Sequence, residues 1–123
     1  MEPLVLIVDD EASVRTLIAN SLRDQGYRIV EAADGVDGLR MAKELRPAAV
    51  VLDIELPALD GTTILQSLRS HHETNLLPII GMSGHDIDPA DERSFTCFLR
   101  KPFSPLDVVF VLAQVAPLQP APG

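Results

Sequence analysis

Carboxylate, hydroxyl and ammonium side chains each follow a short apolar run of this sequence. Asp9 and Asp10 follow the first run, Asp53 the third, Ser83 the fourth and Lys101 the fifth. A carboxylate at the end of a buried run is costly to hold out of water unless something pairs with it. Crowded carboxylates repel one another, and Mg²⁺ relieves the repulsion while water and phosphate oxygens complete its octahedron. These residue types therefore indicate a metal-assisted reaction on a phosphate group.

Asp53 is the candidate nucleophile of this set. A carboxylate beside a metal ion, with a hydroxyl and a lysine to bind the equatorial oxygens, is equipped to attack phosphorus. The product would be an aspartyl-phosphate. Lys101 would pair with Asp53 or with an arriving anion, so Asp53 is expected to meet both a metal ion and a lysine.

Alternating strands and helices are expected to position these residues. Hydrophobic periodicity predicts strands over 4–8, 27–32, 48–52, 79–82 and 97–99. It predicts helices over 12–25, 36–45, around 64–68 and from 104 to about 113. Such alternation implies an α/β fold with a parallel sheet covered by helices on both faces. Ligands of these sheets bind at the carboxyl ends of the strands, where the polar residues fall.

Composition limits the class of protein. The 123 residues, 46% of them hydrophobic, indicate one globular domain, predicted over 1–116 with a Pro-rich tail or linker start over 117–123. A net charge of −8 argues against nucleic acid as a direct ligand of this domain. The lone cysteine, Cys97, fits a reducing compartment, and neither a signal segment nor a membrane span is recognisable. A cytoplasmic location is expected.

Four motifs carry a resemblance to a known family. They are "VDDE" at 8–11, "LDIELPALDG" at 52–61, "MSG" at 82–84 and "KPF" at 101–103. In this order, each at a predicted strand end, they resemble the response-regulator receiver domains of bacterial two-component signalling, the CheY-like superfamily. The resemblance covers residues 4 to about 116. It implies a doubly wound, flavodoxin-like fold with five parallel strands in the order 2-1-3-4-5.

The resemblance also implies a metal site. Asp10 and Asp53 would bind Mg²⁺ directly, and Mn²⁺ is an alternative ion. Asp9 would assist indirectly, through water, and Glu55 would contribute its backbone carbonyl. The loop residues Pro57 and Gly61 are expected to fix φ and to tolerate a positive φ, respectively.

A phosphoryl cycle follows from the same resemblance. Asp53 would accept phosphoryl from a sensor histidine kinase or a histidine phosphotransfer protein, with slow self-catalysed loss rather than enzymatic turnover. Ser83 would hydrogen-bond the phosphoryl group, and Lys101 would form an ion pair with it. Phe98 takes the place of the aromatic switch residue, although a core aromatic is an equal interpretation. The output would pass to a downstream domain or protein.

Two alternatives from other classes remain. Asp53 and Glu55 imitate the acid pair of haloacid-dehalogenase-type phosphohydrolases, but the second acid there is normally aspartate. A pseudo-receiver would bind partners without phosphotransfer, but such domains usually lose an acid or the lysine. Labelling by a small phosphodonor separates the three classes.

The fourth crossover is expected to be short. Only 17 residues separate Ser83 from Lys101, which allows a helix from Pro89 to about Ser94, capped by Asp88. Ile87, Ala90 and Phe95 are its expected apolar anchors. A helix this short is marginal, so we predict a stunted, mobile element. An altered face here favours partner binding or phosphotransfer over standard paired DNA binding.

Overall fold

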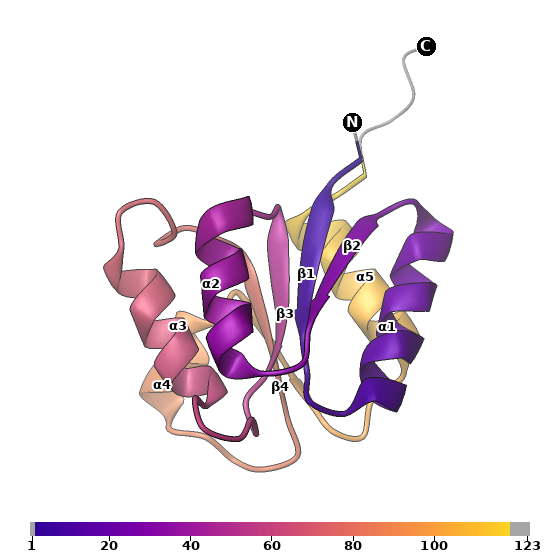
Figure 1. Cartoon of the computed structure of the whole chain (residues 1–123). Helices are drawn as coiled ribbons and strands as arrows, with labels where there is room; N and C mark the ends of the chain where they lie inside the picture. Colours follow the sequence, from indigo (N-terminus) through magenta and orange to yellow (C-terminus); the bar gives the residue numbers. More distant parts are fainter. Residues whose placement is uncertain (1, 119–123) are drawn as a thin grey trace.

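Strands and helices alternate along the whole of residues 2–118, which the computed structural model describes (Figure 1). The strands are β1 Leu4–Val8, β2 Arg28–Ala32, β3 Ala49–Asp53, β4 Ile79–Ser83 and β5 Cys97–Arg100. The helices are α1 Ala12–Gln25, α2 Gly35–Leu45, α3 Gly61–Ser70, α4 Pro89–Ser94 and α5 Pro105–Val115. All strands are parallel and lie in the order β2-β1-β3-β4-β5, which confirms the predicted doubly wound fold.

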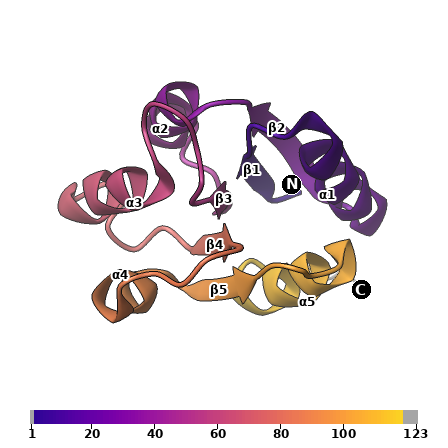
Figure 2. The same ribbon diagram turned by 90° about the horizontal axis from the view of Figure 1, so that it is seen from below.

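The helices cover both faces of the sheet. α1 and α5 pack on one face, and α2, α3 and α4 lie on the other (Figure 2). Val5 and Ile7 of β1 belong to the core beneath α1 and α5, whereas Leu6 and Val8 belong to the core beneath α2 and α3. Successive side chains of a strand point to opposite faces, so the continuous apolar run of β1 is the pattern of a strand buried on both sides.

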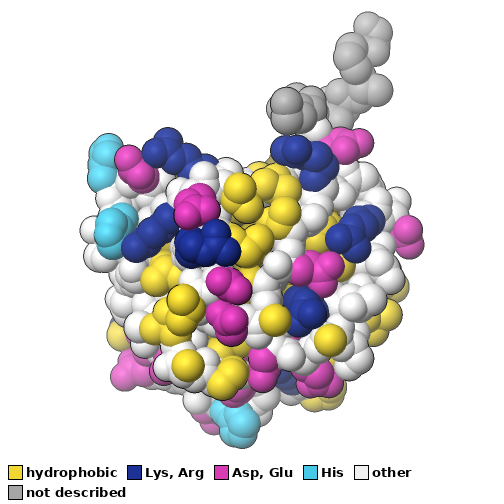
Figure 3. Space-filling model, in the orientation of Figure 1, with side chains coloured by type: hydrophobic (Ala, Val, Ile, Leu, Met, Phe, Trp, Pro, Cys, Tyr) yellow, Lys and Arg dark blue, Asp and Glu magenta, His cyan; other side chains and the backbone are white. Residues whose placement is uncertain are grey.

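The carboxyl ends of the strands meet at the lower edge of the molecule in Figure 1. β2 lies on one side of β1 and β3 on the other, so the strand order reverses between β1 and β3, where ligands of such sheets bind. Val8 of β1 pairs with Leu52 of β3, which brings the residues that follow them, Asp9 and Asp53, to the same place. Figure 3 shows acidic side chains along this lower edge, whereas Lys and Arg lie mostly higher.

Strand boundaries differ from the prediction by about one residue. β3 runs through Asp53, which pairs with Met82, and the Ile54 N–H continues the ladder by donating to the Met82 carbonyl at 2.9 Å. The candidate nucleophile is therefore the last residue of the strand and not the first residue after it. β2 begins at Arg28 because Tyr27 closes the C-terminal turn of α1.

The fourth helix is as short as predicted. α4 has six residues, and the Asp88 side chain caps it by accepting from the Ala90 N–H at 2.8 Å. Phe95 is buried, and a Cβ added to Gly81 of β4 would lie 2.7 Å from its ring. Ala90 is exposed, so its prediction as an anchor is wrong. The Phe95 ring fills the space over Gly81 and leaves α4, which has no buried residue, outside the core.

The loop after β3 differs from the expectation. A positive φ occurs at Ala58, with φ at 66°, and not at Gly61. Gly61 instead begins α3, where a Cβ would lie 2.6 Å from the Ile54 Cα and 2.7 Å from the Asp53 carbonyl oxygen. Only glycine lets the start of α3 come this close to the end of β3.

The last helix ends close to the predicted domain boundary. α5 ends at Val115, and most of the predicted tail, 119–123, lies outside the described residues, so the division at 116/117 stays a prediction.

A membrane-spanning helix needs about 20 apolar residues. Within residues 2–118 no helix is long and apolar enough to cross a membrane.

Candidate functional site

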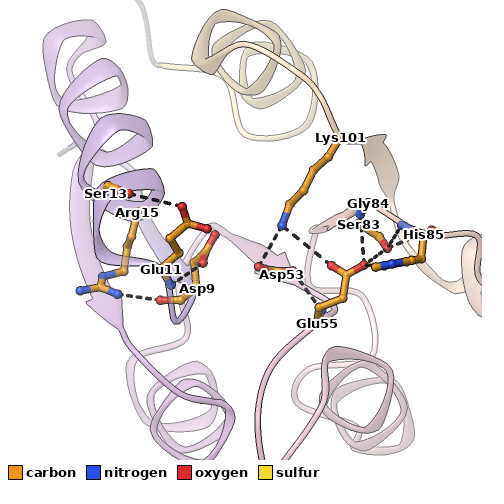
Figure 4. Close-up of polar contacts among 10 residues, drawn as sticks. All are labelled: Asp9, Glu11, Ser13, Arg15, Asp53, Glu55, Ser83, Gly84, His85 and Lys101. Carbon is orange, nitrogen blue, oxygen red and sulfur yellow. Dashed lines mark hydrogen bonds and ion pairs between the residues drawn. The ribbon is translucent and has the colours of Figure 1, made fainter.

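Asp53 lies buried at the end of β3 with a donor on each carboxylate oxygen (Figure 4). The residue is 3% exposed. Its Oδ1 accepts from the Glu55 N–H at 3.0 Å, and its Oδ2 accepts from the Lys101 ammonium at 3.2 Å. Burial and the nearby Asp9 carboxylate raise the pKa of Asp53 to about 7. The folded chain therefore favours a proton or a cation at this carboxylate.

Asp9 is the second buried acid of the site. It is 1% exposed, and its Oδ1 accepts from the Glu11 N–H at 2.8 Å. Its Oδ2 is buried with no hydrogen-bond partner among residues 2–118. Burial raises the pKa of Asp9 above its usual value. Arg15 donates to the Asp9 carbonyl at 2.6 Å and not to its carboxylate, so the orphaned oxygen keeps its need for a partner.

Three carboxylates of the site suit a divalent cation. Asp9, Asp10 and Asp53 each offer one oxygen, and these oxygens lie within 4.8 Å of one another. Asp10 is exposed, so a bound ion would keep access to solvent. A cation, or a water molecule bound to it, would satisfy the orphaned Asp9 oxygen. Oxygen donors of this kind are those that Mg²⁺ and Mn²⁺ prefer, and the residues therefore fit a hard cation.

Lys101 reaches Asp53 from the end of β5, whereas Asp9 lies on the side of Asp53 toward α1 (Figure 4). Its position follows from β5, because its N–H donates to the Ser83 carbonyl at 2.7 Å. The ammonium also lies 3.8 Å from the Glu55 Oε2. Burial lowers the pKa of Lys101, but the carboxylates of Asp53, Asp9 and Glu55 together outweigh burial and raise the pKa above its usual value, so the group stays charged. Asp53 thus lies beside both a group of acids that suits a cation and a fixed ammonium.

The Glu55 carboxylate gathers the remaining donors of the site. Its Oε1 accepts from the Ser83 hydroxyl at 2.5 Å and from the Gly84 N–H at 3.1 Å, and it lies 2.8 Å from the His85 Nδ1. Burial raises the pKa of Glu55, but the Ser83 and His85 hydrogen bonds and further contacts outweigh it and lower the pKa to about 2. The side chain is thus a carboxylate bound by several donors.

Sequence reasoning missed this role of the Glu55 side chain and missed His85 altogether. Only the backbone carbonyl of Glu55 was expected to act. A signal was present: Glu55 stands two residues after Asp53, and His85 stands two residues after Ser83. Because β3 and β4 are neighbouring parallel strands, equal offsets beyond their ends bring such residues together.

Phe98 lies on β5 and is half-buried. Its ring centroid is 5.7 Å from that of Phe95, and the Arg100 guanidinium lies 5.5 Å from its centroid. Phe98 packs against the core beneath α2 and α3, so it is a core aromatic in this conformation. His71 and His72, which follow α3, are exposed and remote from Asp53 in the fold.

A family model described as the response regulator receiver domain matches residues 5–112. The chain belongs to this family. Among curated relatives, the receiver is 34% identical over 112 residues to the alkaline phosphatase synthesis transcriptional regulatory protein PhoP of Bacillus subtilis, covering 88% of this chain and 46% of that protein. It is 32% identical over 120 residues to the DNA-binding dual master transcriptional regulator RpaA of Synechocystis, covering 94% and 48%.

Solved structures of receivers share the fold. The chemotaxis response regulator CheY4 of Vibrio cholerae superposes with a TM-score of 0.83 at 28% identity, covering 94% of this chain and 99% of that one. The receiver domain of the sensor histidine kinase PA1611 of Pseudomonas aeruginosa, whose structure has a magnesium ion coordinated in its active site cleft, gives 0.82 at 27% identity, covering 94% and 98%.

This chain is a receiver domain of the two-component type and a signalling domain, as predicted. The family match favours that class over the phosphohydrolase alternative. The chain spans less than half the length of the curated relatives it matches, from 29% to 48%. Those relatives are transcriptional regulators by name, and their whole-protein activities concern more chain than this one contains.

Proposed function

We propose that Asp53 accepts a phosphoryl group from a phosphohistidine in a Mg²⁺-dependent reaction. The observation that carries the proposal is the environment of Asp53. It is a buried carboxylate with oxygens of Asp9 and Asp10 within 4.8 Å and the Lys101 ammonium 3.2 Å away. The donor would be a sensor histidine kinase or a histidine phosphotransfer protein, and the reaction would take place in the cytoplasm.

The transfer needs little from the protein beyond orientation and charge. An Asp53 oxygen attacks phosphorus, the new P–O bond forms, and the P–N bond breaks. Its electron pair returns to the donor imidazole, which takes a proton from solvent. Lys101 and Ser83 bind the equatorial oxygens, because Ser83 ends β4, the neighbour of β3, and the Lys101 ammonium, which follows β5, reaches Asp53 at 3.2 Å. A bound cation would neutralise part of the negative charge that develops on the phosphoryl oxygens.

The metal would be held by residues at the carboxyl ends of β1 and β3. In this proposal Asp10 and Asp53 bind it directly, Asp9 acts through water, and Glu55 contributes its backbone carbonyl. The orphaned Asp9 oxygen and the grouping of three carboxylates support a hard cation. The magnesium ion in the PA1611 receiver supports Mg²⁺, with Mn²⁺ as the chemically similar alternative.

The aspartyl-phosphate would act as a switch. Its added charge and oxygens would engage Ser83 and Lys101, and Phe98 would respond by turning inward. The output would pass to an attached domain or a separate protein, which fits relatives that are transcriptional regulators. With a net charge of −8, this domain itself is not proposed to bind nucleic acid. Slow self-catalysed hydrolysis would reset it.

Labelling by phosphoramidate with Mg²⁺ tests the proposal. Wild type should gain one phosphoryl group, seen by intact mass, and the group should be stable in acid and labile in alkali. Asp53→Asn should gain none, whereas Asp24→Asn, which removes an exposed acid of α1, should be labelled like wild type. No labelling of wild type would favour a pseudo-receiver, and release of phosphate over many turnovers would favour a hydrolase.

A further inference from the structure

The Glu55 carboxylate occupies the donors that a phosphoryl group on Asp53 would need. Its Oε1 takes the Ser83 hydroxyl and the Gly84 N–H, and its Oε2 lies 3.8 Å from the Lys101 ammonium (Figure 4). A carboxylate and a phosphoryl group are both anions that offer oxygen acceptors to such donors. In this conformation the side chain of Glu55 therefore stands in for the phosphoryl group.

The two anions cannot share these donors. Ser83 has one hydroxyl hydrogen, and Gly84 has one backbone N–H. The Ser83 hydroxyl lies 2.5 Å from the Glu55 Oε1 and 2.9 Å from the His85 carbonyl, so its hydrogen already has two acceptors. A third acceptor on Asp53 gains a bond only if Glu55 gives one up. Two negative groups around one ammonium also repel each other.

We propose that Glu55 is an internal competitor for the phosphoryl site, and that its side chain must leave Ser83, Gly84 and Lys101 before an anion on Asp53 can bind them. This inference rests on the proposed function of Asp53. It assigns Glu55 a side-chain role in addition to its backbone carbonyl. The strength of these contacts then sets how readily phosphorylation, or an analogue of it, reaches the switched conformation.

The Glu55 side chain can turn out into solvent, and His85 is the residue that contacts its carboxylate on that side. The Glu55 side chain is 35% exposed, so its carboxylate reaches water by turning away from β4. The His85 side chain is 83% exposed and lies 2.8 Å from Oε1 on the solvent side. His85 is thus a positioning residue for the resting conformation. The charge of Glu55 stays hydrated after displacement, so no buried ion remains.

Beryllofluoride with saturating Mg²⁺ is a suitable probe, because it forms a phosphoryl analogue on an aspartate without turnover. The variants are Glu55→Ala, Glu55→Gln and the control Glu11→Gln. Glu11 carries the same charge at the same edge, but its side chain contacts Ser13 and none of the donors in question. Binding is followed by the amide resonance of Gly84, which also reports on Glu55 before any probe is added.

Glu55→Ala should shift the Gly84 amide upfield in the free protein, since its charged acceptor is gone. It should also lower the half-saturating beryllofluoride concentration by at least about tenfold, which corresponds to about 1.4 kcal/mol. Glu55→Gln should fall between Ala and wild type, because its amide oxygen still accepts from Ser83. Glu11→Gln should change the concentration by no more than about twofold, as expected for an exposed, screened charge.

Equal half-saturation in wild type and Glu55→Ala would overturn the inference, since Glu55 would then not compete. Equal gains in Glu55→Ala and Glu11→Gln would also overturn it, because general charge would explain both. If wild type and every variant fail to bind beryllofluoride or to be labelled by phosphoramidate, the proposed function of Asp53 fails instead. The Gly84 resonance separates these cases, because it tests the resting contact without any phosphoryl chemistry.

Discussion

Asp53 and Lys101 are 48 residues apart in the chain, yet the Asp53 Oδ2 lies 3.2 Å from the Lys101 Nζ. The strands β4 and β5 lie between these two residues in the chain, and because the sheet is parallel both residues lie at the same edge. The second Asp53 oxygen accepts from the Glu55 N–H, and an oxygen of Asp53 lies within 4.8 Å of oxygens of Asp9 and Asp10. Asp53 is therefore paired with a fixed ammonium and lies among acids that suit a cation.

Magnesium should stabilise the folded domain through Asp10. At about tenfold above its dissociation constant, a ligand that binds only the folded state stabilises it by about 1.4 kcal/mol. We expect a rise in Tm of wild type with Mg²⁺ and almost none for Asp10→Asn, measured by thermal unfolding. Asp24→Asn serves as the control for loss of an acid. If Asp10→Asn responds to Mg²⁺ as wild type does, Asp10 is not a ligand.

The metal-free domain should lose stability as the pH rises. The folded pKa of Asp53, about 7, lies above its ordinary value of 3.8, so the folded chain binds this proton more tightly than the unfolded chain does. Its contribution to stability is full below about pH 3.8 and is lost as the pH rises through 7. In EDTA at pH 8, Asp53→Asn should melt about 4 °C or more above wild type.

The matched comparison for this effect is the difference between the two proteins at each pH. The stabilisation of Asp53→Asn over wild type should shrink between pH 8 and pH 5, and Mg²⁺ should reduce it at pH 8. A difference that does not change with pH would mean that Asp53 ionises without a penalty in the fold, contrary to its burial.

Beryllofluoride binding should move Phe98. In the resting conformation its ring contacts Phe95 and the Arg100 guanidinium. If Phe98 turns inward as Ser83 changes its partner, the ring signals and the Arg100 side-chain signals should shift together in the NMR spectrum. Leu106, which is exposed at the start of α5, is an internal reference. A spectrum in which Ser83 shifts and Phe98 does not would separate the two residues and leave Phe98 in its core role.

α4 should open more readily than the other helices. It has six residues and none of them is buried, whereas α3 buries Ile64, Leu65 and Leu68. Helices without buried contacts open locally with a free energy near zero. Amides of 91–94 should therefore exchange with deuterium at least about a hundredfold faster than those of the α3 interior. Slow exchange throughout α4 would show that its surface contacts hold it rigid.

Phe95 should be far more important for stability than its helix. Its ring covers Gly81, so Phe95→Ala should leave a cavity and reduce the free energy of unfolding by about 3–5 kcal/mol. Asp88→Ala, which removes only the cap of α4, should reduce it by about 1 kcal/mol or less. Chemical denaturation measures both. Equal losses would mean that α4 and the core are coupled more tightly than burial indicates.

The sheet and the shortened helix could be predicted because they depend on local patterns. β-branched apolar runs define the strands, and Asp88-Pro89 defines the start of α4. The end of β3 was misplaced because pairing with Met82 extends the strand through Asp53, and pairing is not visible in one segment alone. Likewise Gly61 is required by a neighbour, the Asp53 carbonyl, and not by its own φ.

The side-chain network of the site was harder to predict. The acids, Ser83 and Lys101 were found because the carboxyl ends of parallel strands share an edge. The Glu55 carboxylate depends on which way one long side chain turns, and its partners Ser83 and His85 come from another strand. Motif spacing gives the backbone position of such a residue but not the direction of its side chain.

Because Glu55 belongs to the same chain as Asp53, its carboxylate affects how the domain responds to dissolved anions. A group tethered by two residues to Asp53 competes at an effective concentration on the order of millimolar or above, whatever the composition of the surroundings. If Glu55 competes as proposed, free phosphate and sulfate at lower concentrations should displace it poorly from Ser83 and Gly84. Only an anion that is itself bound to Asp53 would have an effective concentration comparable to that of the tethered carboxylate. The domain would thus respond to a phosphoryl group bonded to Asp53 and only weakly to anions in solution.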